Sequence, residues 1–204
     1  MKSAKAPQPR PYVMRKRARS AAATAERVLD AAAEVFAEAP YSQLTLAGVA
    51  GRAGVTVQTV IRRFGDKEGL VAAAAARRTA TVSRERGEAP VGDLPGIVEN
   101  LLDHYEAHGD LALRLLAEEQ ASPTIGELTR TAREFHRDWC GKVFEPYLSG
   151  LEGVDRDRRL AQFAAVCDVY TWKLLCRDSR LGRRQVSTAL LELLRPLAGA
   201  APIR

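Results

Sequence analysis

The amino-acid sequence predicts an all-α protein, with a small helical domain at the N-terminus and a larger helical domain after it. Two observations predict this fold class. Apolar residues recur at helical spacings along most of the 204-residue chain, and no segment alternates as a β-strand would. Glycine and proline residues interrupt this pattern at intervals, as they do between helices. With 46% hydrophobic residues, the chain can bury a sizeable core.

The segment 44–54 predicts the first of two short helices that meet at a sharp corner. Thr45 is a good N-cap, because its hydroxyl can accept a hydrogen bond from an unpaired backbone N–H. Gly54 follows the helix and can adopt the positive φ that such a corner requires. The apolar residues at helical spacing are Leu46, Val49, Ala50 and Ala53.

The second short helix is predicted over residues 57–63, with Thr56 as its N-cap. Gly65 ends it and Asp66 caps the following helix. Its apolar side comprises Val57, Val60 and Phe64. The side chains left facing outward are Gln58, Thr59, Arg62 and Arg63. Such a helix suits the major groove of DNA, where Arg can bind guanine, Gln can bind adenine, and Thr can contact a thymine methyl or a phosphate.

Together with residues 27–36, this segment resembles the DNA-binding domain of TetR-family transcriptional regulators. The resemblance covers about residues 24–78. One position departs from the family pattern, because Ile61 stands where a tyrosine is usual; Arg62 and Arg63 are candidates to replace the phosphate contact of that tyrosine. The matching positions are Thr45, Val49, Ala50, Ala53, Gly54, Val55, Thr56, Thr59, Val60, Phe64, Lys67 and Leu70.

The predicted DNA contacts come from this domain and from the basic segment before it. Residues 1–20 hold seven Lys and Arg residues and three prolines, so we expect a flexible arm. This arm is either simply solvated or reaches along the phosphate backbone or into the minor groove. The expected contacts are Thr45, Thr56, Val57, Gln58, Thr59, Arg62, Arg63 and Lys67 in the domain, and Arg15, Arg17 and Arg19 in the arm.

The charge distribution agrees with a DNA-binding end. Residues 1–78 carry 14 Lys and Arg against 6 Asp and Glu, a net charge of +8, whereas residues 79–204 carry 17 against 19, a net charge of −2. A basic end on a nearly neutral body is typical of proteins that bind nucleic acid at one end and do something else at the other. The expected partner is a double-stranded DNA operator with an inverted repeat.

We therefore expect a DNA-binding domain over residues 21–70 and a helical ligand-binding and dimerisation domain over residues 71–204. The clearest punctuation in the body is a loop at residues 87–95. The helices predicted in the body are 71–82, 95–107, 110–121, 123–148, 155–178 and 183–197.

The last two predicted helices are too apolar to be covered easily by one chain, and a second copy is the simplest cover. The TetR resemblance also implies a homodimer with a four-helix interface. The alternative is that these helices form only the core of the monomer. The expected core face is Leu160, Phe163, Cys167, Tyr170 and Leu174. The expected dimer interface is Ala165, Val169, Trp172, Cys176, Leu190, Leu193 and Leu194.

The middle helices are expected to enclose a pocket for a small, largely apolar effector, because such sites are apolar cavities with a few polar groups. The alternative is that these residues are ordinary core. The candidate lining residues are Leu101, Tyr105, Leu116, Glu119, Phe135, Trp139, Phe163 and Tyr170.

Several other classes of function have little support in the sequence. His104 and His108 are interpreted as a solvated pair rather than a metal site, and no cofactor is expected. The three cysteines form no metal-binding spacing, so we expect buried free thiols. No nucleophile elbow or phosphate-binding loop indicates an enzyme. No apolar run suits a membrane span or a signal peptide, so we expect a cytoplasmic protein.

The function that these observations favour is sequence-specific DNA binding by a transcriptional regulator, expected to be a repressor that a small effector releases from its operator. Activation is the other possible outcome. The alternative from another class is a non-specific, architectural DNA-binding protein without an effector. The ratio of specific to random DNA affinity and its salt dependence would discriminate between the two.

Overall fold

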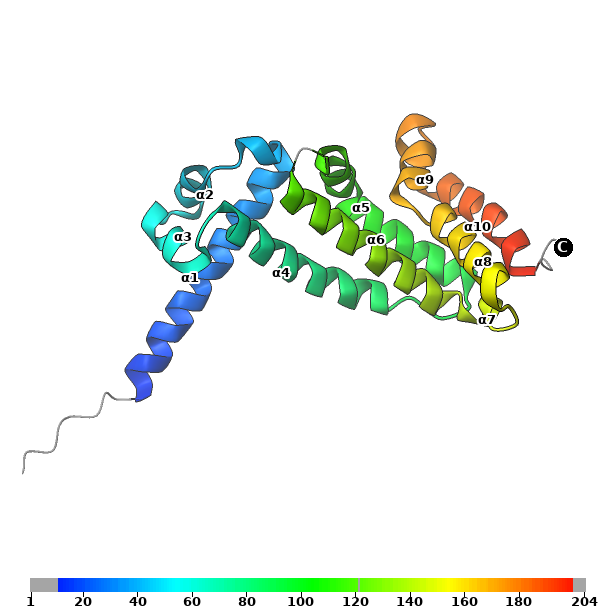
Figure 1. The fold of residues 1–204 in the computed structure, drawn as a ribbon, viewed down its shortest axis with the longest axis horizontal. Helices are drawn as coiled ribbons and strands as arrows, with labels where there is room; N and C mark the ends of the chain where they lie inside the picture. Colours follow the sequence, from blue (N-terminus) through cyan, green and yellow to red (C-terminus); the bar gives the residue numbers. More distant parts are fainter. Residues whose placement is uncertain (1–10, 121, 200–204) are drawn as a thin grey trace, which may run out of the picture. The chain divides into compact units, whose positions relative to one another are not determined.

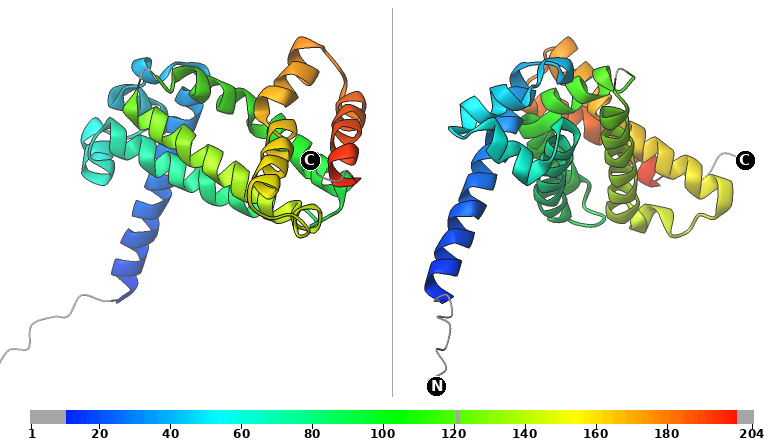
Figure 2. Two further views of the ribbon diagram at one scale, coloured as in Figure 1. Left: turned by 45° about the vertical axis from the view of Figure 1, so that its right-hand side comes forward. Right: turned by 60° about the vertical axis from the view of Figure 1, so that its left-hand side comes forward.

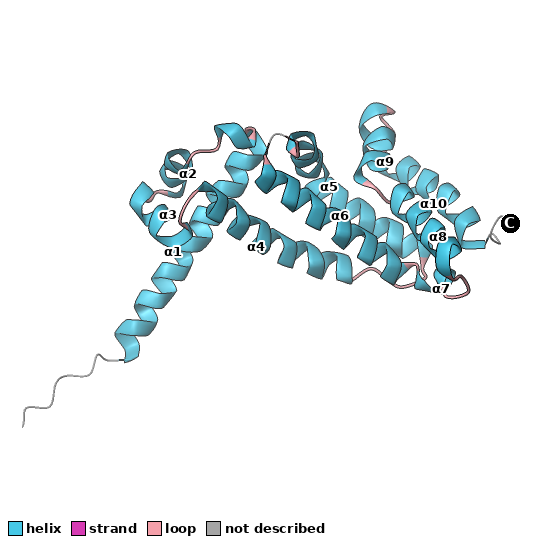
Figure 3. Ribbon diagram, viewed as in Figure 1, coloured by secondary structure: helices cyan, strands magenta, loops and turns pink. Residues whose placement is uncertain are grey.

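The computed structural model describes residues 11–120 and 122–199, and every regular element in these ranges is helical, which confirms the all-α class (Figures 1 and 3). The chain divides into two compact units, one ending at Ala74 and the other beginning at Ala75. The helices are α1 (Pro11–Glu38), α2 (Leu46–Ala53), α3 (Val57–Phe64), α4 (Lys67–Gly87), α5 (Leu94–Glu118), α6 (Pro123–Val143), α7 (Glu145–Leu148), α8 (Gly153–Val166), α9 (Val169–Lys173) and α10 (Arg183–Gly199).

The corner between α2 and α3 forms as its local chemistry predicts. Thr45 Oγ1 accepts a hydrogen bond from Gly48 N at 3.0 Å, and Gly54 adopts φ +65°. Thr56 Oγ1 accepts from Thr59 N at 3.2 Å and so caps α3. Each cap satisfies a backbone N–H that has no partner in the first turn of its helix.

A small core holds the first unit together. Val28 and Ala32 of α1, Val49 of α2 and Val60 of α3 are buried, as is Leu70 at the start of α4. Val60 is the one residue of α3 in this core, so the helix rests on the domain along a narrow stripe.

The expected apolar side of α3 was therefore partly wrong. Val57 is 38% exposed, and Phe64 is only partly buried. Val57 is the first residue of the helix, directly after the Thr56 cap, and it remains at the surface although it lies three positions before Val60.

The expected flexible arm differs from the structure over its second half. Residues 1–10 lie outside the described residues, but α1 begins at Pro11 and includes residues 11–20. Proline is favoured in the first turn of a helix, and the Arg, Lys, Met and Ala residues that follow are good helix formers. Arg15 and Arg17 are residues of this helix, and the structure describes only their backbone. Arg19 is exposed.

In the second unit, the predicted break at Gly109 was wrong, because α5 runs without interruption through this residue (Figure 1). Gly109 is buried against the indole ring of Trp172, which is 1% exposed. A Cβ atom at this position would lie 2.6 Å from Trp172 Cζ3. The glycine therefore allows close packing between α5 and α9 rather than a turn.

Two predicted long helices are interrupted instead. The helix expected over 123–148 breaks at Phe144, because Pro146 lacks the N–H that a continuing helix needs. The helix expected over 155–178 breaks at Cys167 and Asp168. The Asp168 carboxylate accepts from Tyr170 N at 2.8 Å, a cap that starts α9 anew.

This second break changes which residues face the core, and a π-helical turn over Leu174–Asp178 changes the phase again. Tyr170 and Leu174 were expected in the core and are instead 51% and 57% exposed. Four residues expected at a dimer interface lie in the core of the single chain, namely Val169, Trp172, Leu190 and Leu194. Three other expected interface residues remain at least partly accessible, namely Ala165, Cys176 and Leu193.

The core of the second unit is aromatic at its centre. Phe144 and Phe163 stack with ring centroids 4.1 Å apart, and Tyr105 lies 5.7 Å from Trp172. The hydroxyl of Tyr105 donates to the carbonyl of Cys167 at 2.9 Å. These contacts join α5 to the α8–α9 segment, beside which α10 packs (Figure 2).

Candidate nucleic-acid interface

The outer face of α3 presents polar groups that are free to bind. Gln58, Arg62 and Arg63 are exposed, and within the described part of the chain no hydrogen bond or ion pair holds their side chains. Thr59 is partly exposed, and its hydroxyl lies 2.9 Å from that of Thr56. An unengaged guanidinium or amide can form paired hydrogen bonds with a base edge without first breaking a contact within the protein.

The same helix also exposes apolar side chains. Ile61 is 40% exposed and lies one turn after the exposed Val57, so the two share a side of α3. Aliphatic groups in the major groove contact the methyl group of thymine. Ile61 stands at the position where the sequence lacks the tyrosine usual in the family, so an apolar side chain is exposed there in place of a phenol.

Lys67 is engaged within the domain. Its Nζ atom donates to the carbonyl of Tyr41 at 2.5 Å and lies 3.9 Å from the centre of the Tyr41 ring. The Tyr41 hydroxyl donates to Glu68 Oε1 at 3.0 Å. The sequence-based interpretation of Lys67 as a phosphate contact missed this role, because nothing local connects Lys67 to a residue 26 positions earlier.

The Arg52 side chain fixes α2 to α1. Its guanidinium donates to Glu38 at 2.6 Å and lies 3.7 Å from Glu34. The hydrogen bond from Arg52 lowers the pKa of the Glu38 carboxyl. Arg52 is therefore less available for DNA than the arginines of α3.

The candidate pocket residues differ in their exposure. Leu101, Tyr105, Trp139 and Phe163 are buried core residues, and Tyr170 is exposed, which corrects its expected place in a pocket. Three more are partly buried, namely Leu116, Glu119 and Phe135. Glu119 accepts hydrogen bonds from Arg133 and Thr129, at 2.6 and 3.0 Å.

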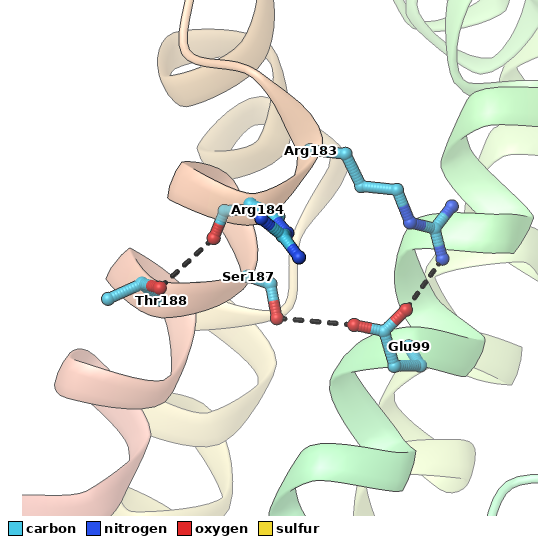
Figure 4. Close-up of a pocket in the computed structure, with 5 residues that line it drawn as sticks. All are labelled: Glu99, Arg183, Arg184, Ser187 and Thr188. Atoms are coloured by element: carbon cyan, nitrogen blue, oxygen red, sulfur yellow. Dashed lines mark hydrogen bonds and ion pairs between the residues drawn. The ribbon is translucent and has the colours of Figure 1, made fainter.

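One hollow among the described residues is a polar surface groove of about 590 Å³ between α5 and α10 (Figure 4). Arg183 binds three carboxylates of α5 there, at 2.5–2.8 Å: Glu99, Asp103 and Glu106. Ser187 lies 3.3 Å from Glu99. This groove has none of the predicted lining residues, and two of its charged side chains, Glu99 and Arg183, pair with each other.

The two histidines of α5 were wrongly interpreted as a solvated pair. His108 Nε2 lies 3.2 Å from Glu85, and its side chain is 19% exposed. His104 is largely buried, and burial lowers its pKa to about 2. Among the described residues, no group of three His, Cys, Asp or Glu side chains could hold a metal ion. No described helix has the length and apolar character needed to cross a membrane.

The cysteines are free thiols in the structure, as expected. Cys140 and Cys167 are buried, and Cys176 is partly buried. Cys140 Sγ lies 3.7 Å from His136 Nε2. Hydrogen bonds from Cys167 and His136 lower the pKa of the Cys140 thiol to about 5.

Comparisons with known proteins agree with this geometry. Residues 28–74 match the family model of bacterial regulatory proteins, tetR family. No curated protein sequence matches the chain.

Three solved structures share the fold. A protein from Pseudomonas aeruginosa PAO1, solved as a transcriptional regulator, has 16% identity and a TM-score of 0.68 over 87% of this chain and 91% of that one. A transcriptional regulator from Rhodococcus sp. has 22% identity and a TM-score of 0.66, over 88% and 99%. The regulator FadR from Bacillus subtilis, solved in complex with stearoyl-CoA, has 21% identity and a TM-score of 0.59, over 86% and 98%.

The two capped helices α2 and α3 are joined through the left-handed Gly54, and α3 exposes Gln and Arg side chains that have no partner among the described residues. This arrangement is that of a helix-turn-helix DNA-binding protein. Residues 28–74 form a DNA-binding domain of the tetR-family type, as the sequence resemblance predicted. The chain is accordingly a DNA-binding transcriptional regulator.

Proposed function

We propose that the protein is a homodimeric repressor that a small molecule releases from an operator with an inverted repeat. Its DNA-binding domain would cover about residues 21–70 and its effector and dimerisation domain residues 71–204. The observation that carries this proposal is α3, whose capped and exposed face offers Gln58 and Arg62 to base edges. In a two-fold dimer, two such helices would read two half-sites.

A second copy of the chain is the proposed cover for apolar side chains that α8–α10 leave exposed. Tyr170, Leu174 and Leu193 are each about half exposed, and Ala165 is also accessible. A change of Leu193 to Glu would place a charge in such an interface, which is strongly unfavourable. We expect L193E to sediment as a monomer, while V91E, at an exposed apolar residue of the α4–α5 loop, stays a dimer. A dimeric L193E would contradict this interface.

An effector is supported by the size of the body, since binding DNA needs only the first unit. The FadR neighbour was solved with stearoyl-CoA, so this fold can hold an apolar ligand in that protein. In this chain, an effector would favour one arrangement of α4, which continues from the DNA-binding domain into the second unit. Its effect on operator affinity cannot exceed its preference between the two arrangements.

The test of the proposed reading helix is base preference. Gln58→Ala and Arg62→Ala should each cost about 1–3 kcal/mol of operator binding and relax the preference at particular base pairs. The matched control is Arg195→Ala, which removes an exposed arginine of α10. Selection from random DNA that returns an unchanged motif for both α3 variants would overturn the assignment.

The same binding experiment separates the proposal from an architectural role. A sequence-specific regulator should prefer its operator to random DNA by about 10³-fold or more at physiological salt. A ratio near one, with a steep dependence on salt, would favour the architectural protein instead.

A further inference from the structure

The core of the second unit contains a buried guanidinium without a hydrogen-bond partner among the described residues. Arg86 lies near the end of α4 and is 2% exposed. Its Nε, Nη1 and Nη2 atoms are all buried, and within the described residues none has a hydrogen-bond partner. Burial lowers the pKa of this guanidinium, and the nearby Tyr105, Cys140 and Cys167 side chains offset only part of that effect.

The contacts that Arg86 does make are with aromatic rings. Its Cζ atom lies 3.5 Å from the centre of the Trp139 ring and 5.9 Å from that of Tyr105. Trp139 Nε1 donates to the carbonyl of Arg86 at 2.9 Å. The Trp139 ring lies against the guanidinium and attracts its positive charge. The ring does not accept hydrogen bonds from the N–H groups at the edge of the guanidinium.

The acidic residue next to Arg86 in the sequence is engaged elsewhere. Glu85 pairs with His108 at 3.2 Å. A buried charge lacking its partner is strongly unfavourable, and an apolar residue of similar size would be more stable there. A partner from outside the chain explains why an arginine occupies this position.

Two further buried atoms without partners lie on the neighbouring turns of α5. They are Asn100 Oδ1 and His104 Nδ1. Asn100 Nδ2 donates to the carbonyl of Glu85 at 2.8 Å, which places this amide beside the end of α4. His104 is one turn further along the same face. The contact between α4 and α5 thus contains the Arg86 guanidinium, which can donate to an anion. It also contains Asn100 Oδ1, which can accept from a hydroxyl or N–H group.

We propose that Arg86 is the anchor for the carboxylate of an anionic effector whose apolar part packs against Trp139 and Tyr105. The planar guanidinium matches a carboxylate with two parallel hydrogen bonds. A monoanion neutralises the single positive charge, whereas a phosphate dianion would leave a net negative charge in an apolar core. This inference rests on the proposed effector function and names the chemical class of that effector.

The test compares acids with their neutral amides. Phenylacetate and octanoate are the probes, and phenylacetamide and octanamide are the controls of equal shape. The carboxylates should raise the Tm of the protein in a concentration-dependent way, by about 5–10 °C at one hundred times Kd. The amides should raise it by much less. Equal shifts for acids and amides, or no shift with either acid, would overturn the proposal.

Variants of Arg86 separate binding from a structural role. Arg86→Met replaces the unpaired charge with an apolar side chain of similar length, so without ligand it should be at least as stable as the wild-type protein. It should also lose the shift with carboxylates. Arg195→Met is the control and should keep the wild-type response. A strongly destabilised R86M, or an R86M that keeps the carboxylate shift, would refute the assignment.

One internal rival for the anionic partner is the thiolate of Cys140, whose thiol has a lowered pKa. Cys140→Ser removes that thiolate and should leave the carboxylate shift unchanged. If C140S abolishes the preference for acids over amides, the thiolate rather than Arg86 determines ligand choice, and the proposal fails.

Operator binding is measured separately from the Tm. Carboxylates that bind through Arg86 but leave operator affinity unchanged would support this site and refute effector release. Neutral compounds that stabilise the protein and release the operator would support effector release and refute an anionic effector.

Discussion

Replacing Gly109 with alanine tests the packing between α5 and α9. In an exposed helix interior, Gly→Ala stabilises by about 1 kcal/mol. Here the new Cβ atom would lie 2.6, 2.9 and 3.1 Å from three ring atoms of Trp172. The ring is fully buried and cannot swing into solvent. Overpacking of this kind costs about 1–3 kcal/mol, so the loss should exceed the gain and leave a net destabilisation of up to about 2 kcal/mol.

The assay is urea unfolding followed by circular dichroism, with Gly141→Ala as the matched control. Gly141 is a glycine of α6 whose added Cβ would lie 4.0 Å from the methyl groups of Leu160, an ordinary contact. G141A should therefore be neutral or more stable. A smaller ring in the double variant G109A/W172F should recover part of the loss. A G109A protein as stable as G141A would refute the argument that this glycine is required for packing.

Three further predictions concern the caps, Lys67 and His104. Thr56→Ala removes the N-cap of α3 and should cost about 1 kcal/mol in unfolding free energy, measured by urea, and T56S should restore it. Lys67→Met removes the donor to the Tyr41 carbonyl and should lower the stability of the protein by about 1 kcal/mol; a salt slope of DNA binding reduced by about 1 would show that the ammonium also reaches a phosphate. The folded pKa of His104 is about 2, below its value of 6.5 in the unfolded chain, so the unfolded state binds the proton first as the pH falls. The unfolding free energy therefore loses nothing to His104 above pH 6.5 and decreases as the pH falls below that value. His104→Gln should flatten the dependence of the unfolding free energy on pH between 6.5 and 4.

Local chemistry explains which parts of the fold were predictable. The caps at Thr45, Thr56 and Asp66 and the left-handed Gly54 depend on residues within three positions, so the sequence reveals them directly. The exposure of Gln58, Arg62 and Arg63 on α3 follows from the same pattern. All-α character is equally visible, because helical periodicity persists along the chain.

Long-range contacts explain the errors. Gly109 looked like a helix end, yet its environment is set by Trp172, more than sixty residues later. The break before α9 could have been recognised from Asp168, which is a good N-cap residue, but the apolar run around it suggested a continuous helix. Without that break, Tyr170 and Leu174 were wrongly expected in the core, whereas Val169 and Trp172 occupy it.

The anchor proposed for the effector had no sequence signal. Arg86 follows other arginines in a charged segment, Arg77, Arg78 and Arg84, which is the usual pattern of a solvated helix. Only the tertiary structure shows that, of these four arginines, Arg86 is the buried one, and that its guanidinium has no hydrogen-bond partner among the described residues.

The apolar side chains at the surface of α3 would affect how the proposed reading helix responds to modified DNA. In a major groove, Val57 and Ile61 would contact a methyl group rather than a charge or a hydrogen-bonding pattern. A cytosine methylated at C5 presents its methyl group in the major groove at the same edge as thymine does. Methylation of an operator cytosine facing these residues would supply a contact that the unmodified base lacks. The epigenetic state of the promoter, and not its base sequence alone, would then set how firmly the regulator is held.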